Sequence, residues 1–70
     1  MYKISRVSAL SEIMEEIEKN NYEVANKMMA IVIKSIKSDK VKNQYTSYIS
    51  LSKKETKLFK NYIEDNEEQD

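Results

Sequence analysis

The chain has 70 residues, with no Gly, Pro, Cys, Trp or His, and its twelve basic residues balance twelve acidic ones. Without His and Cys there is no zinc, haem or Ser-His-Asp chemistry, and without Gly there is no phosphate-binding loop of the nucleotide-dependent enzymes. We therefore expect no enzyme, no cofactor, no metal and no small-molecule substrate. Because a chain this short buries only about 60% of its unfolded surface, we expect a homodimer.

The first predicted helix follows a short arm, 2–7, that could be extended. Ser8 is its expected N-cap. Its apolar stripe has a spacing of three and four residues and consists of Val7, Leu10, Met14 and Ile17, widened by Ile13. Its other side is acidic and consists of Glu12, Glu15, Glu16 and Glu18. This pattern predicts an amphipathic helix.

The second predicted helix begins near Asn20, which stands three residues before Glu23 in the spacing of a capping box. Its centre is apolar all round, which is typical of a bundle centre or a dimer interface. The expected interface residues are Val24, Met28, Ile31, Val32, Ile33 and Ile36. A heptad rhythm also runs through the junction, so one long coiled-coil helix with Asn21 as its buried polar position is an alternative.

The third segment, 39–51, fits helical spacing, although its alternation of Tyr, Ser, Ile and Leu is also typical of a strand. We favour a helix because no partner strand is evident. Ser52 and Glu55 have capping-box spacing, which predicts a last helix ending near residue 65. The sequence thus predicts an all-α domain of three to four helices over 1–65, followed by an acidic, frayed tail at 66–70.

The first half of the chain resembles the ribbon-helix-helix repressors in its order of elements. The resemblance rests on YKISRV followed by ALSEIMEEIEKNN, in which Leu10, Met14 and Ile17 form the helix stripe. In that family the N-terminal strands of two copies pair and enter the DNA major groove. The resemblance therefore implies, as an alternative fold, a paired N-terminal strand with an extra C-terminal helix. Either Lys3 and Ser5 or the set Tyr2, Ile4 and Arg6 would then face the DNA.

The balanced charge hides a segregation along the chain. The net charge is +2 over 1–11, −4 over 12–23, +7 over 24–60 and −5 over 61–70. Such blocks steer partners of opposite sign. The basic block is a candidate nucleic-acid contact, in which ammonium groups flank two aromatic rings, although we favour a solvated face. Its candidate residues are Lys34, Lys37, Lys40, Lys42, Tyr45, Tyr48, Lys53 and Lys54.

The acidic block is available to a basic protein partner or to the basic block of a second copy. Its candidate contacts are Glu12, Glu15, Glu16 and Glu18. We expect a small non-catalytic regulatory or inhibitory protein, of the phage- or mobile-element-like kind, that acts by binding a larger protein partner. A nucleic-acid-binding regulator that uses the Lys- and Tyr-rich segment 34–60 is the alternative. No stretch reaches the ~20 apolar residues of a membrane span, so we expect no membrane partner and a cytoplasmic location.

Overall fold

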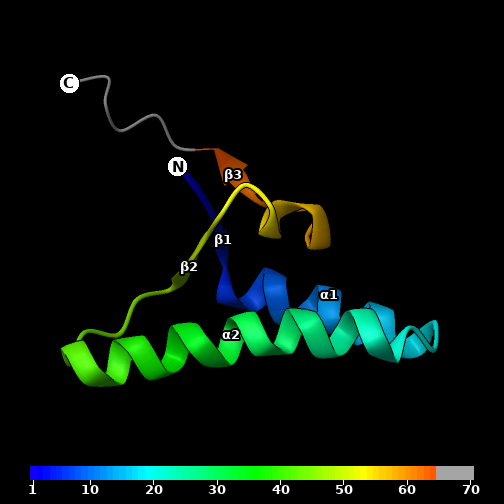
Figure 1. Ribbon diagram of the computed structural model, residues 1–70, viewed down its shortest axis with the longest axis horizontal. Coiled ribbons are helices and arrows are strands. Elements are labelled where there is room, and N and C mark those ends of the chain that lie inside the picture. Colours follow the sequence, from blue (N-terminus) through cyan, green and yellow to red (C-terminus); the bar gives the residue numbers. More distant parts are fainter. Residues whose placement is uncertain (65–70) are drawn as a thin grey trace.

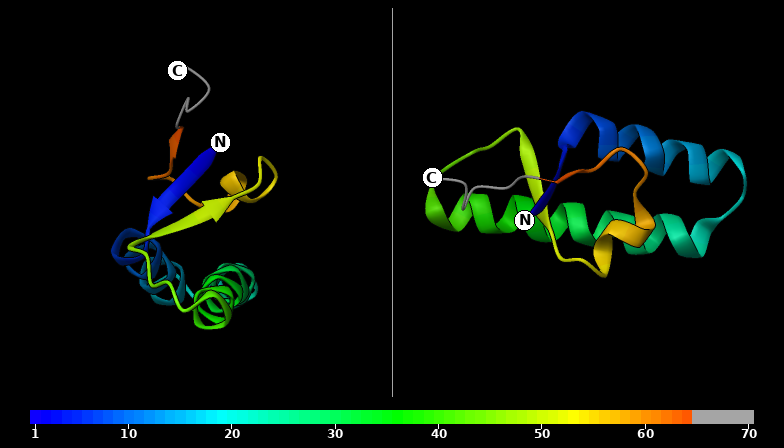
Figure 2. Two further views of the ribbon diagram at one scale, coloured as in Figure 1. Left: turned by 90° about the vertical axis from the view of Figure 1, so that its left-hand side faces the viewer. Right: turned by 90° about the horizontal axis from the view of Figure 1, so that it is seen from above.

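The computed structural model describes residues 1–64, which form two helices and a small sheet (Figure 1). In chain order the elements are β1 (Tyr2–Ser5), α1 (Arg6–Glu18), α2 (Tyr22–Lys42), β2 (Tyr48–Leu51), the 3-10 turn η1 (Glu55–Leu58) and β3 (Ile63–Glu64). The helices lie side by side and antiparallel, and the sheet and η1 cover one side of them (Figure 2). The fold is therefore α+β, and the predicted all-α helical bundle is wrong.

β1 is the central strand of the three-stranded antiparallel sheet, whose order is β2-β1-β3. Ile4 pairs with Ile49 of β2, while Tyr2 and Lys3 pair with Glu64 and Ile63 of β3. Both edges of β1 are thus engaged within the chain over Tyr2 and Lys3. A ribbon-helix-helix dimer needs this strand to pair with a second copy, so that alternative is wrong.

The helices are separate, and the coiled-coil alternative is also wrong. Asn20 adopts a left-handed conformation with φ 64°, which breaks the helical path between α1 and α2. Asn21 is the N-cap of α2 but makes no side-chain capping bond, so the predicted capping box does not form. At the start of α1 the N-cap is Ser5 rather than Ser8: the backbone N–H of Ser8 donates to Ser5 Oγ at 3.1 Å.

The segment 39–51 is mostly not helical, so that prediction is wrong too. α2 ends at Lys42, and Asn43 follows in a left-handed conformation with φ 55°, which terminates the helix. In β2 the exposed Tyr48 and Ser50 alternate with the buried Ile49 and Leu51. The alternation in the sequence therefore marks a half-buried strand whose partner is β1, more than forty residues away in the chain.

The predicted last helix is replaced by η1 and an extended segment. The capping box itself forms: Ser52 N–H donates to Glu55 Oε1 at 2.8 Å, and Glu55 N–H donates to Ser52 Oγ at 3.2 Å. The turn stops at Phe59, which is extended (φ −120°, ψ 143°) and only 3% exposed. Because this geometry places the Phe59 ring in the core, a longer helix does not form.

The core lies between the helix layer and the sheet, with Phe59 beside it. Its buried apolar residues are Ile4, Ala9, Ile13, Ala25, Met28, Val32, Ile49, Leu51 and Phe59. Glu12 is also buried at 3% exposure, and its carboxylate accepts the backbone N–H of Lys60 at 2.7 Å and of Asn61 at 2.9 Å. This carboxylate ties α1 to the connection between η1 and β3. The predicted tail, 66–70, lies outside the described residues.

Candidate functional site

An open groove of about 300 Å³ separates the C-terminal half of α2 from β2 and the segment that joins them. It is lined by Ile31, Lys34, Ser35, Ser38, Asp39, Lys42, Gln44, Thr46, Tyr48, Ser50 and Glu55. Two ammonium groups and several hydroxyls therefore share one surface with two carboxylates. Lys, Ser, Thr and Tyr side chains are the groups that proteins commonly present to phosphate oxygens.

The first of these carboxylates, Asp39, is taken up by the fold. Its Oδ2 accepts the backbone N–H of Thr46 at 3.0 Å and forms a charge-assisted hydrogen bond with the guanidinium of Arg6. The Thr46 amide first, and Arg6 in addition, hold the pKa of Asp39 below its ordinary value of 3.8. Arg6 neutralises this carboxylate, so it adds little negative potential to the groove.

The same contacts fix the turn that carries the chain from α2 to β2. The backbone N–H of Arg6 donates to the carbonyl of Ser47 at 2.8 Å, and the N–H of Gln44 donates to the carbonyl of Asp39 at 3.0 Å. Arg6 is the first residue of α1, so α1, α2 and the turn are joined at one point. The wall of the groove is thus held in place by hydrogen bonds.

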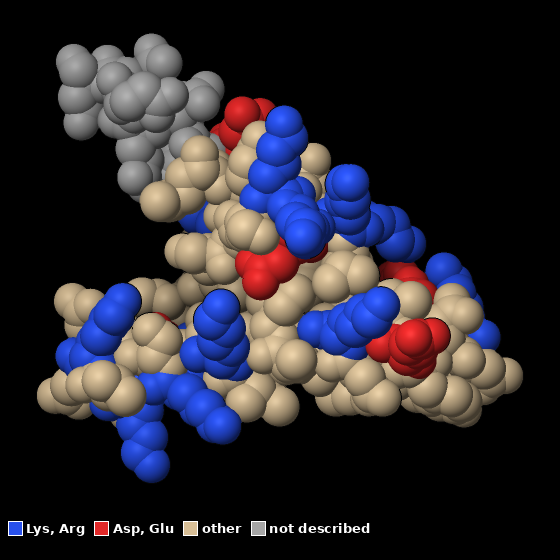
Figure 3. All heavy atoms as spheres, viewed as in Figure 1, with Lys and Arg blue, Asp and Glu red and all other residues tan. Residues whose placement is uncertain are grey.

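The second carboxylate, Glu55, caps η1 through the N–H of Ser52. Asp39 and Glu55 are the only acids between residues 24 and 60, where the sequence carries nine Lys. Arg6 offsets the charge of Asp39, whereas Glu55 keeps its charge; the nine Lys outnumber the two acids, so this half of the molecule is positive. Figure 3 shows Lys side chains over the C-terminal half of α2 and over the η1 segment on one face of the molecule.

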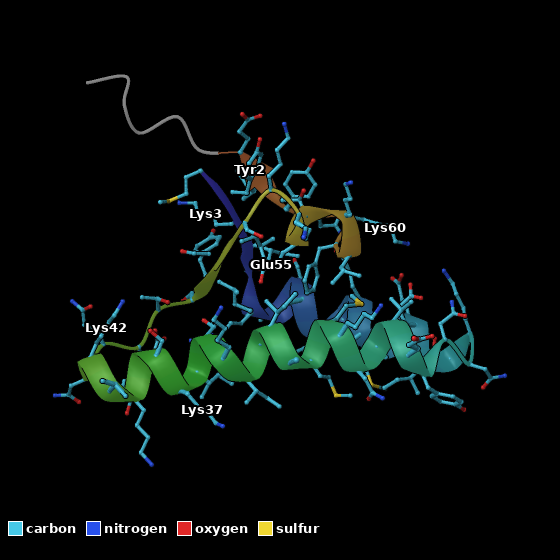
Figure 4. The ribbon with its side chains drawn as sticks, viewed as in Figure 1. Tyr2, Lys3, Lys37, Lys42, Glu55 and Lys60 are labelled. Atoms are coloured by element: carbon cyan, nitrogen blue, oxygen red, sulfur yellow. The ribbon has the colours of Figure 1, made fainter. Side chains whose placement is uncertain are left out.

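The structure divides the predicted nucleic-acid contacts into two groups. Lys34, Lys42 and Tyr48 line the groove, whereas Lys37 and Lys40 lie further round α2. Figure 4 shows Lys37 on the edge of α2 that points away from the sheet. Lys53 and Lys54 directly precede η1, are exposed and do not line the groove.

The two tyrosines differ in what their rings offer. The ammonium of Lys3 lies 5.0 Å from the ring centroid of Tyr48, so one face of that ring is covered by a cation. Tyr45 is 70% exposed and lies on the turn beside the groove. Of the two, Tyr45 is therefore the better platform for a stacked base.

Sequence reasoning missed the hydroxyl groups of the groove. Ser35 and Ser38 share the α2 wall with Lys34 and Lys42, because residues three and four apart face the same way on a helix. This spacing was a usable signal. No local sequence signal places Thr46 and Ser50 in the groove, because their positions depend on the long-range pairing of β2 with β1.

The predicted acidic contacts are largely engaged inside the chain. Glu12 is buried, Glu15 Oε1 lies 3.3 Å from the ammonium of Lys60, and Glu16 Oε1 accepts from the Asn21 side chain at 2.9 Å. Glu18 is exposed at the end of α1. These carboxylates therefore serve the fold more than an outside partner.

The predicted interface residues are also divided by the fold. Met28 and Val32 lie in the core, and Val24 and Ile31 pack against it half-buried. Ile33 and Ile36 are 50% and 45% exposed. Only these two of the six are turned to the outside.

Within residues 1–64 no three acidic side chains lie close enough together to hold a metal ion. In the same part of the chain, neither helix has the length and apolar character needed to cross a bilayer. No protein-family model matches the sequence, and comparisons with curated proteins and with solved structures find no match.

Proposed function

We propose that this protein is a small non-catalytic regulatory protein that binds nucleic acid in the groove between α2 and β2. The proposal is supported by the ion pair of Asp39 with Arg6, which leaves Lys34 and Lys42 facing the charge of Glu55 alone in the groove. The groove therefore offers a ligand two ammonium groups and the hydroxyls of Ser38, Tyr48 and Ser50, against one remaining carboxylate charge. These groups suit a phosphate backbone.

A single strand suits this surface better than a duplex. The groove is narrow and open, and Tyr45 stands exposed on the turn next to it, where an unpaired base can stack. The chain has one guanidinium, that of Arg6, and Asp39 holds it. Because bidentate reading of guanine uses Arg, binding should depend little on base sequence. As part of the same proposal we place the protein in the cytoplasm.

The test is fluorescence anisotropy of a labelled single-stranded oligonucleotide titrated with the full chain. With phosphate contacts from Lys34 and Lys42, affinity should fall about 7-fold between roughly 50 and 200 mM salt. The double variant Lys34→Gln, Lys42→Gln should bind more weakly and lower the slope of log K against log salt by about 1.4. No binding by wild type at low salt and micromolar protein would refute the proposal.

The matched control is the double variant Lys19→Gln, Lys27→Gln. It removes the same charge from positions that do not line the groove, so its salt slope should stay near that of wild type. Poly-glutamate serves as a competitor. If it displaces the oligonucleotide as well as unlabelled nucleic acid does, the groove binds polyanions without preference for nucleic acid, and the nucleic-acid proposal fails.

A further inference from the structure

The side of the helix layer that faces away from the sheet carries no other element of residues 1–64 (Figure 2, left). On α1, Leu10 and Met14 directly follow the buried Ala9 and Ile13, and on α2 Ile33 follows the buried Val32. Each step turns a helix by about 100°. The two helices are antiparallel and both pack under the sheet (Figure 2, left). This turn therefore carries Leu10 and Met14 of α1, and Ile33 of α2, to the side of the helix layer that faces away from the sheet.

The exposed side of α1 carries more large apolar side chains than its fully buried side. α1 buries Ala9, Glu12 and Ile13 and packs Ile17 half-buried against the core. Its large apolar side chains on the outer side are Val7, Leu10 and Met14, which are 79%, 51% and 56% exposed. An amphipathic helix of a monomer turns its most apolar side to the core. The large apolar side chains on the outer side of α1 are therefore removed from water only when another surface covers that side.

We propose that a second copy of this chain covers the outer side of the helix layer. Val7, Leu10, Met14, Ile33 and Ile36 form the apolar surface there, and each is 45–79% exposed. A standard interface buries about 800 Å² on each partner, with an apolar centre and a polar rim. The outer side supplies the apolar centre, and the neighbouring polar residues of both helices supply the rim.

The charges at the two ends of the outer side fit a second copy that runs in the opposite direction. Glu18 and Glu23 lie at the end where the helices join, with Lys19 beside them, while Lys37 and Lys40 lie towards the far end of α2. A two-fold rotation that reverses the helices places lysines over acids at both ends. It also sets α2 antiparallel to its own copy, which the helix dipoles favour.

This surface differs from the interface expected from the sequence. Ile33 and Ile36 belong to it, but Met28 and Val32 are in the core of one copy and take no part. Val7, Leu10 and Met14 of α1 are added. A dimer of this kind leaves the groove between α2 and β2 open on each copy, since the groove lies on the sheet side of α2.

The test is the molar mass of the full chain in solution by sedimentation equilibrium, together with a charge placed on the outer side. Wild type should give twice the 8.3 kDa of one chain at tens of micromolar protein. Leu10→Asp should raise the dimer dissociation constant at least about 100-fold, because it places a charge in the apolar centre of the interface. Val41→Asp, at an 87% exposed position outside the stripe, is the matched control and should remain dimeric.

A cysteine variant keeps the test decisive if Leu10→Asp does not fold. The chain has no Cys, so Leu10→Cys carries one thiol. Its thiol should become protected from a thiol reagent as the protein concentration rises through the range of dimerisation, whereas the thiol of Val41→Cys should stay reactive. A wild type with the mass of one chain at 200 micromolar, or a thiol in Leu10→Cys whose reactivity does not change with protein concentration, would overturn the proposal. Monomers that bind lipid vesicles or a larger protein through Leu10 would overturn it as well.

Discussion

The buried carboxylate of Glu12 offers the sharpest test of how the two halves of this chain are joined. It accepts the backbone N–H of Lys60 at 2.7 Å and of Asn61 at 2.9 Å, across 48 and 49 residues of sequence. Hydrogen bonds to a charged group contribute about 1.5–3 kcal/mol each. Lys60 and Asn61 are exposed, so water can hydrogen-bond to their N–H groups when the carboxylate is removed. We therefore take the lower value for each bond.

Glu12→Ala should therefore lower the free energy of unfolding by about 3 kcal/mol. A chain of this length has a total of roughly 4 to 10 kcal/mol, so the loss is a large fraction. Glu12→Gln keeps one acceptor oxygen and should lose about half as much. The measurement is urea or thermal unfolding followed by far-UV circular dichroism, at one fixed protein concentration because dimerisation changes apparent stability. Glu12→Ala should lower the Tm by more than about 10 °C.

The control is Glu15→Gln on the same helix. Glu15 lies 3.3 Å from the Lys60 ammonium, but both side chains are about half exposed, so this pair should contribute less than about 1 kcal/mol. The reasoning is refuted if Glu12→Ala unfolds within about 0.5 kcal/mol of wild type, or if it is no more destabilising than Glu15→Gln.

Ser5→Ala removes the N-cap acceptor of α1 and should cost about 1 kcal/mol in a urea titration, while Ser5→Asp, which keeps an acceptor, should cost less. Asp39 has a pKa below 3.8 in the folded chain, so it stabilises the fold above that pH, and this stabilisation is lost as pH falls through the lowered pKa. Asp39→Asn should therefore unfold with a weaker dependence on pH below about 4, and an unchanged acid limb would contradict the role of Arg6 and Thr46. Ile4→Ala, at a fully buried position, should cost about 2–5 kcal/mol, whereas Val41→Ala should change unfolding by less than about 0.5 kcal/mol.

The helices were predictable because their signals are local. The spacing of apolar residues marks α1 and α2, and the Asn20-Asn21 pair marks the break between them, which the left-handed Asn20 confirms. The N-cap residue of α1 was harder to predict from the sequence. Ser5 and Ser8 both suit an N-cap, and the choice depends on where β1 ends.

The sheet was not predictable in the same way because its pairing is long-range. The alternation over 45–51 is visible in the sequence, but its partner is the arm at Tyr2–Ser5, and no turn signal joins the two. At Ser52 and Glu55 the local signal is real and the capping box forms. A longer helix does not follow, because Phe59 has an extended backbone that places its ring in the core.

The sites show the same division between local and long-range information. Lys34 and Lys42 could be chosen from the sequence, and their alignment with Ser35 and Ser38 follows from helical spacing. The role of Arg6 could not be foreseen, because its pairing with Asp39 spans 33 residues and depends on how α1 and α2 pack.

The most direct test of the central claim is a titration of the ¹⁵N-labelled full chain with a single-stranded oligonucleotide, followed by amide chemical shifts. The groove account predicts that the largest shifts fall on Ser35, Ser38, Thr46 and Ser50, with small changes on the outer side of α1. The account is contradicted if no amide shifts at low salt, or if the shifts fall on α1 and leave these four amides unmoved.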